Sequence, residues 1–262
     1  MKKFFSVAIA LIASFVLQAQ TADEVINKYI AAAGGKDKLE AINTLQYVRT
    51  INLNTPMGEI NITMTNIKVE NKLSRTNTSS ELFGNAYSLF TDTSGWIIIP
   101  PNQFTGTEEI RQKLKPEEYK AMKSEMACEG YFPELVNYAA KGYTAEFAGE
   151  GKSNGKASYK IKLKKDKDER VYFIDKQTGL VNSMTVKGAT AVAMTGLGSM
   201  MPNGGGRADK MEATLEFSEY KETAGVKFPG KLKIDTPMGA VESTISFVTV
   251  NQPVDAKWYR AN

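Results

Sequence analysis

From residue 45 onward, apolar and polar side chains alternate with the period of two that is typical of β-strands. Ile60, Ile62 and Met64 are one clear example. Short turns rich in Gly, Pro and Asn separate such runs, which favours consecutive antiparallel strands. We count roughly eleven strands, and an antiparallel sheet of that size is expected to curl. They lie near residues 45–53, 60–69, 73–80, 86–90 and 96–99, resume at Tyr143 and continue through 158–164, 170–175, 180–186, 210–220, 226–234 and 241–250.

Two local features refine the strand prediction. Ile67 and Val69 fall out of phase with the residues before them, which predicts a bulge near Thr65 and Asn66. The sequence Thr-Pro-Met-Gly occurs at 55–58 and again at 236–239, each time between two alternating runs. We interpret the two copies as the same turn chemistry in two hairpins rather than as a duplicated domain, because their flanks do not otherwise match.

Helical patterns occupy two regions. Residues 21–42 begin with Thr21 and Glu24 at the spacing of a capping box, and Gly34 and Gly35 divide the region into two helices. Residues 108–140 interrupt the strands. Here we predict helices at 108–114, from Pro116 onward and at 132–140, which together form a lid over the sheet.

The N-terminus has the pattern of a secretory signal peptide. Lys2 and Lys3 precede a short apolar run, and Ala19 supplies a small residue at the expected cleavage point. We therefore predict a signal peptide at 1–19 and a single exported domain at 20–262 without a membrane-spanning segment, because the apolar run is shorter than the roughly 20 residues that a spanning helix needs.

Composition excludes several kinds of site. The chain has no His, so catalysis by Ser-His-Asp or Cys-His and every His-containing metal site are excluded. Without the two lysines of the signal segment, the formal charge of +4 falls to +2, which argues against a nucleic-acid partner.

The single Cys128 lies among apolar helical positions and is expected to be buried and inert. Asp166, Asp168 and Glu169 lack the Gly and terminal Glu of a calcium loop and indicate a polar hairpin tip. No metal and no cofactor is expected.

One loop is unusually apolar. Residues 192–202 are rich in Met and Gly and carry no charge, whereas loops between strands are usually polar. Met194, Met200 and Met201 could belong to a flap over an apolar cavity, since methionine adapts to irregular apolar partners. The alternative is a loop that packs on the core.

One face of the sheet is the candidate ligand-binding surface. Spacing by two places the members of three sets on one side of their strands: Ile60, Ile62 and Met64; Leu215 and Phe217; Ile245 and Phe247. These residues, with the three methionines of the flap, are the predicted lining of a cavity. The alternation does not distinguish a cavity wall from a packed core.

Several segments resemble the exported LolA-like proteins of Gram-negative bacteria, the outer-membrane lipoprotein-sorting family. They are TADEVI (21–26), YIAAAGGKDKL (29–39), YTAEF (143–147), GKASYKI (155–161), YFIDKQTGL (172–180) and YKETAGVKFP (220–229). The resemblance spans most of the exported chain. It implies a half-open antiparallel β-barrel around an apolar cavity with a helical lid, and a periplasmic role in lipoprotein transport.

The expected function is therefore a non-catalytic periplasmic carrier or sensor that binds lipid, acyl chains or lipoproteins in the half-barrel. The alternative is a structural module of the cell envelope, in which side chains fill the barrel and the protein binds other envelope proteins. An enzyme is disfavoured because no nucleophile and base occur together in a recognisable motif.

Overall fold

The computed structural model describes residues 21–55, 58–81, 84–102, 105–188, 190–191, 211–236 and 239–261. The predicted signal peptide and the predicted flap with Met194, Met200 and Met201 lie outside the described residues. None of the described helices is long and apolar enough to cross a membrane.

The predicted N-terminal helix pair is confirmed. Helix α2 (Ala22–Ala33) begins at a capping box in which the Glu24 amide donates to Thr21 Oγ1 at 3.2 Å and the Thr21 amide donates to the Glu24 carboxylate at 3.0 Å. Helix α3 (Lys36–Glu40) follows after Gly34 and Gly35. Gly34 has a φ of 136°, and a Cβ on it would lie 2.4 Å from the Gly225 carbonyl oxygen, so glycine is required there.

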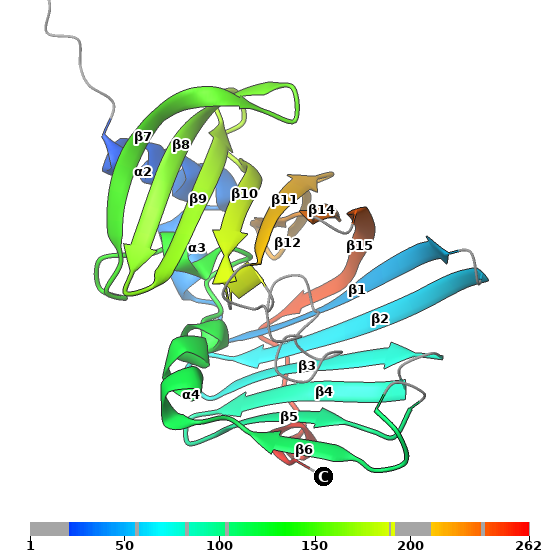
Figure 1. Cartoon of the computed structure of the whole chain (residues 1–262). Helices are drawn as coiled ribbons and strands as arrows, with labels where there is room; N and C mark the ends of the chain where they lie inside the picture. The colour runs from blue at the N-terminus through cyan, green and yellow to red at the C-terminus, as the bar shows by residue number, and fades with distance from the viewer. Residues whose placement is uncertain are drawn as a thin grey trace, which may run out of the picture.

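Fifteen strands are described, and thirteen of them form one antiparallel sheet in the order β6-β5-β4-β3-β2-β1-β15-β14-β11-β10-β9-β8-β7. Figure 1 shows this sheet bent, with β2–β6 at one end, β7–β10 at the other and α2 behind β7–β9. The sheet is open, so the predicted fold class, a mainly β chain with a large curled antiparallel sheet and accessory helices, is confirmed. The strands are β1 (Thr44–Thr55), β2 (Gly58–Val69), β3 (Leu73–Ser80), β4 (Gly84–Thr91), β5 (Gly95–Ile99), β6 (Ile110–Lys113), β7 (Thr144–Ser153), β8 (Lys156–Lys165), β9 (Asp168–Asp175), β10 (Val181–Lys187), β11 (Glu212–Ser218), β12 (Lys221–Thr223), β13 (Val226–Phe228), β14 (Lys231–Thr236) and β15 (Gly239–Val250).

Both Thr-Pro-Met-Gly segments join hairpins, as predicted. Thr55 pairs with Gly58 between β1 and β2, and Thr236 pairs with Gly239 between β14 and β15. The two hairpins also lie side by side, because β1 pairs with β15. Strands from the two ends of the chain therefore meet in the middle of the sheet.

The predicted bulge in β2 is wrong. Strand β2 pairs without a register shift with both β1 and β3. Ile67 falls out of phase because it is buried on the other face of the sheet, in a cluster with Leu73, Tyr87, Leu89 and Ile98. We call this face the outer face, and the face that packs against α2 the inner face.

The C-terminal segment covers the outer face of β3–β5. Its 3₁₀ helix η6 (Ala256–Tyr259) packs Trp258 and Tyr259 on the outer cluster. Arg75 on β3 donates to the carbonyl oxygens of Trp258 and Arg260 at 3.3 and 2.8 Å, and its guanidinium lies 3.9 Å from the centre of the Tyr87 ring. Buried on both faces, this part of the sheet departs from simple alternation.

The predicted helical lid is only partly confirmed. A helix does begin at Pro116: α4 (Pro116–Met122) continues into the 3₁₀ helix η1 (Lys123–Met126). Residues 110–113 form the edge strand β6 instead of a helix, since Ile99 and Ile110 pair across β5 and β6. Residues 132–140 contain only the short 3₁₀ helix η2 (Pro133–Leu135) and turns. The apolar residues Phe132, Leu135 and Val136 of this segment are buried in the core.

Candidate functional site

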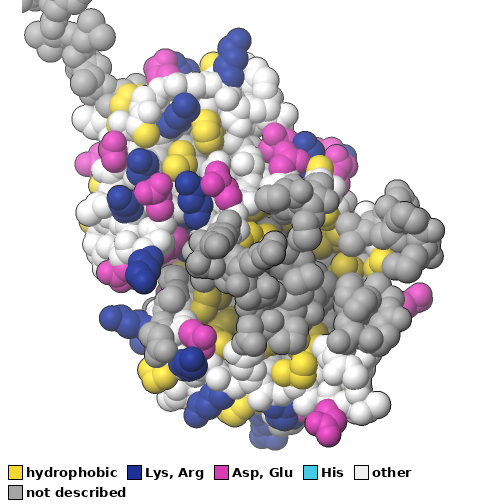
Figure 2. Space-filling model, viewed as in Figure 1, with side chains coloured by type: hydrophobic (Ala, Val, Ile, Leu, Met, Phe, Trp, Pro, Cys, Tyr) yellow, Lys and Arg dark blue, Asp and Glu magenta, His cyan; other side chains and the backbone are white. Residues whose placement is uncertain are grey.

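The inner face of the sheet has two halves that differ in what covers it. Over the half formed by β7–β11 and β14, the helices and the segment around residue 132 fill the concavity with a large continuous core. Val25, Ile26 and Tyr29 of α2 pack there with Ile161 and Tyr172 of the sheet. On the opposite, outer surface of β7–β9, Figure 2 shows Lys and Arg interspersed with Asp and Glu. This half has a packed interior and a solvated exterior.

Leu215, Phe217 and Ile245 belong to this packed core. The Phe217 ring lies edge-on to Phe132 and Tyr131, with ring centres 4.8 and 5.7 Å apart. The sequence predicted these residues as lining of a cavity, but here side chains of other elements fill the space before them. Phe217 also lines a small hollow of about 210 Å³ beside the β9–β10 turn, at the margin of the core.

Phe247 lies on the wrong side of its strand for the predicted lining. A register shift between β1 and β15 breaks the alternation after Ser246, and Phe247 adopts a left-handed φ of 51°. Its side chain is 80% exposed. The prediction that Phe247 shares a face with Ile245 is therefore wrong, because the bulge inserts one residue and reverses the side to which the ring points.

Ile60, Ile62 and Met64 lie in the other half of the inner face, as a separate group. Ile62 and Met64 form a small cluster with Ile51 of β1, and the partly buried Ile60 and Val241 flank it. Directly paired residues share a face, so the pairing of Ile51 with Ile62 confirms the predicted period of two. No helix of the described part of the chain contributes to this cluster.

Small side chains continue this surface across the next two strands. Thr78 and Ser80 of β3 pair with Met64 and Ile62, and Ala86 of β4 pairs with Thr78. All three small residues are buried. Small residues on an inner face leave room above the strands, whereas large ones fill it. The inner face of β1–β4 thus carries a buried patch of apolar and small hydroxyl-bearing side chains.

A buried arginine and two tyrosines separate the two halves. Arg49 of β1 is paired with Ile245 of the packed half and with Met64 of the other, and its Nη2 donates to Met64 Sδ at 2.8 Å. Tyr47 and Tyr131 lie beside it with ring centres 5.8 Å apart. Burial raises the pKa of Tyr47 to about 12, although the Arg49 charge opposes this. Both phenols therefore stay neutral hydrogen-bonding groups at physiological pH, since burial also raises the pKa of Tyr131.

A buried ion network lies inside the packed half, and the sequence did not indicate it. The Arg170 guanidinium is 3.0 Å from Glu134 and 2.9 Å from Asp168. Tyr172 donates to Glu134, and Tyr143 and Thr190 donate to Asp168 at 3.2 and 2.9 Å. Burial lowers the pKa of Arg170, but the charge of Glu134 outweighs it and holds that pKa well above its usual range. The prediction of a polar hairpin tip holds for Asp166, while Asp168 is part of this network.

The ion pairs and hydrogen bonds of this network connect η2 to the sheet. They also engage the charged groups that could otherwise act as catalytic acids or bases. The two carboxylates are both engaged by Arg170, so neither is placed as a general base. Cys128 is buried, and burial raises the pKa of its thiol to about 12. A thiol with such a pKa is protonated at neutral pH and is a poor nucleophile.

The sequence matches no family model and no curated protein. Among solved structures, the chain is similar to the LolA superfamily protein NE2245 from Nitrosomonas europaea, with a TM-score of 0.55, 11% identity and coverage of 92% of this chain and 98% of that one. A DUF1329 family protein from Desulfovibrio piger has a TM-score of 0.57 and 10% identity, over 92% and 97% of the two chains. A putative outer membrane lipoprotein-sorting protein domain from Vibrio parahaemolyticus has a TM-score of 0.50 and 12% identity, over 89% and 97%. The chain thus has the fold of LolA superfamily proteins, and the predicted resemblance is confirmed for the fold.

Proposed function

We propose that this protein is a non-catalytic carrier or sensor that holds acyl chains of a lipid or lipoprotein against the inner face of β1–β4. The observation that carries the proposal is the difference between the two halves of the inner face. Helices fill one half, whereas Ile51, Ile60, Ile62 and Met64 line the other beside small side chains. Burying an acyl chain there contributes about 25 cal/mol for each Å² of apolar area, with no need for a polar contact.

The fold supports the same reading. One structure of this fold carries the name of a lipoprotein-sorting protein, and another that of the LolA superfamily. Fold does not determine function, so the proposal rests mainly on the surface itself. The absence of His from the sequence and the buried, protonated Cys128 support a role without covalent catalysis.

The site of action in this proposal is the periplasm. The signal-peptide pattern predicts an exported protein that begins near Gln20. The intact mass of the protein from the cell envelope should correspond to cleavage after Ala19. A mass that includes Met1 would contradict export by a cleaved signal.

Binding is tested with a fluorescent fatty-acid probe and the chain from residue 20 to 262. The wild type should take up the probe. Ile62→Trp should reduce uptake strongly, because an indole on the inner face of β2 occupies the space of an acyl chain. Thr63→Trp is the matched control: Thr63 is exposed on the outer face of the same strand, so uptake should stay at the wild-type level.

The same two variants separate a cavity from a packed core. Over a cavity, Ile62→Trp should unfold within a few degrees of the wild type. In a packed core, the larger side chain would cost about 1–3 kcal/mol. Such a loss, together with no probe uptake by the wild type, would contradict the carrier proposal.

A second candidate is an envelope module that binds other proteins, and Phe247 favours it. An aromatic side chain 80% exposed on a residue with a left-handed φ is unusual on a soluble surface. Two results together would favour this candidate over the carrier. The wild type would take up no probe, and Phe247→Ser would abolish co-purification of an envelope protein without changing stability.

A further inference from the structure

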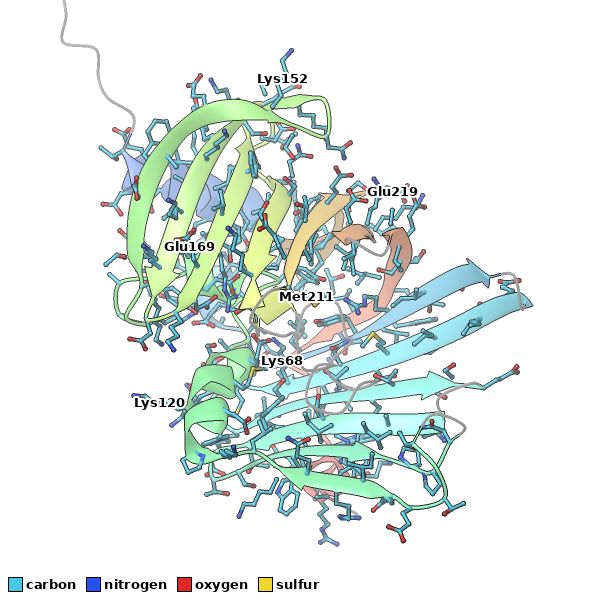
Figure 3. All side chains as sticks on the ribbon, viewed as in Figure 1. Lys68, Lys120, Lys152, Glu169, Met211 and Glu219 are labelled. Atoms are coloured by element: carbon cyan, nitrogen blue, oxygen red, sulfur yellow. The ribbon has the colours of Figure 1, made fainter. Side chains whose placement is uncertain are left out.

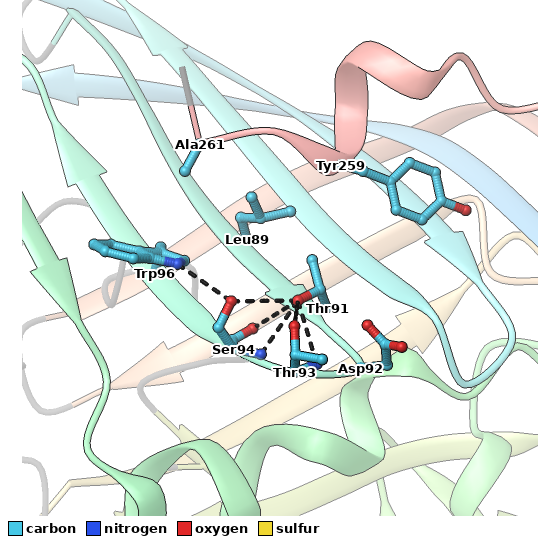
Figure 4. Close-up of a pocket in the computed structure, with 8 residues that line it drawn as sticks. All are labelled: Leu89, Thr91, Asp92, Thr93, Ser94, Trp96, Tyr259 and Ala261. Carbon is cyan, nitrogen blue, oxygen red and sulfur yellow. Dashed lines mark hydrogen bonds between the residues drawn. The ribbon is translucent and has the colours of Figure 1, made fainter.

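A second hollow, of about 330 Å³, opens on the outer face of the sheet, opposite the proposed acyl-binding surface. Leu89 forms its floor, Trp96 of β5 lines one side and Tyr259 of η6 lines another. Figure 4 shows Trp96 and Tyr259 on opposite sides of Leu89, with the β4–β5 turn at one end. The volume lies at the small end of the range for ligand pockets, which suits a ligand of one or two rings.

The turn at the end of the hollow is held in place by Thr91. Its Oγ1 accepts from the backbone amides of Thr93 and Ser94 at 3.4 and 3.2 Å. The indole Nε1 of Trp96 donates to Ser94 Oγ at 3.3 Å, which fixes the ring plane. The carboxylate of Asp92 and the hydroxyl of Tyr259 have no hydrogen-bond partner among the described residues. Both groups are thus available to a ligand.

The charges around the hollow determine which ligand it suits. Aromatic rings beside a carboxylate also suit an ammonium group. Here, however, cations already lie at the neighbouring rings: Lys113 Nζ is 5.6 Å from the centre of the Trp96 ring, and the Arg75 guanidinium is 5.4 Å from that of Trp258. A further cation would be repelled. A neutral ring with an apolar face and several hydroxyls fits better, since its hydroxyls donate to a carboxylate in strong, charge-assisted hydrogen bonds.

We propose that this hollow binds a neutral saccharide. One sugar ring stacks on Trp96, and two of its hydroxyls donate to the Asp92 carboxylate. Tyr259 closes the other side of the hollow with its ring. The C-terminal segment, held on the sheet by Arg75, thereby completes a site that is independent of the acyl-binding surface.

The chain offers a direct reporter for this site. It has two tryptophans, Trp96 and Trp258, and both pack on the outer cluster. We would titrate the chain from residue 20 to 262 with maltose, cellobiose and N-acetylglucosamine and follow tryptophan fluorescence into the tens of millimolar range. At least one sugar should give a saturable change. Asp92→Asn should weaken its binding about tenfold, the effect expected for a hydrogen bond to a charged group.

Asp37→Asn is the matched control, because Asp37 is an exposed carboxylate on α3, away from the hollow. It should bind as the wild type does. Tyr259→Phe should weaken binding less than Asp92→Asn, and Asp92→Asn should keep the wild-type melting temperature because Asp92 is exposed. No saturable change with any of the three sugars would overturn the proposal, as would equal affinity in Asp92→Asn. Saturation by choline chloride but not by the sugars would overturn it in favour of a cation site.

Discussion

Arg170→Met should be among the most destabilising single substitutions in this protein. It removes the only cation within 4 Å of Glu134 and of Asp168 among the described residues, and it leaves both carboxylates in the packed half. Breaking a buried ion pair by removing one partner typically costs about 3–5 kcal/mol. For a chain of this size, that corresponds to a fall of roughly 10 °C in the melting temperature, measured by circular dichroism.

Two further variants test the cause. Lys164→Met breaks an exposed ion pair with Glu169 at 3.6 Å and should cost less than about 1 kcal/mol. Adding Glu134→Leu to Arg170→Met should restore part of the lost stability, since the double variant no longer buries one unpaired carboxylate. Wild-type stability in Arg170→Met would show that the network contributes little to the free energy of unfolding.

Phe217→Ala should cost about 3–5 kcal/mol, the usual effect of truncating a fully buried phenylalanine. The ring is 1% exposed and touches Tyr131 and Phe132 edge-on, so its removal leaves a cavity lined by aromatic side chains. Thr214→Ala on the outer face of the same strand should cost less than about 1 kcal/mol. Urea unfolding of both variants measures the difference.

The Phe217→Ala variant also tests which half of the inner face binds an acyl chain. If Phe217 lined an acyl cavity, Phe217→Ala would enlarge that cavity, and probe uptake would rise with little loss of stability. The structure leads to the opposite expectation, a large loss of stability. A stable Phe217→Ala variant with increased uptake would move the proposed acyl site into the half of the sheet that we describe as packed.

Local sequence patterns predicted the elements that depend on near neighbours. The capping box at Thr21, the helix start at Pro116 and the two Thr-Pro-Met-Gly hairpins are all confirmed. Each depends on hydrogen bonds or dihedral preferences within a few residues. The same patterns were wrong at residues 108–114 and 132–140, where pairing with β5 and burial in the core override helical spacing.

The candidate site was predictable only in part. Ile60, Ile62 and Met64 share the inner face as predicted, because alternation alone places them. The different positions of Phe217 and Phe247 were not predictable. One is covered by residues near 131, far away in the sequence, and the other is turned outward by a bulge against β1. The network of Arg170 and the hollow beside Trp96 likewise join residues from distant segments.

The sequence by itself therefore determined the class of the protein: mostly strands, antiparallel, with an N-terminal helix pair and a pattern for export. The tertiary structure alone decided which half of the inner face is filled, why Ile67 is buried on the outer face and where the C-terminal segment lies. The physical reason is the separation along the sequence over which each interaction acts. Alternation and capping act between neighbours along the chain, whereas Arg75 meets the Arg260 carbonyl across 185 positions, and only the folded sheet brings the two together.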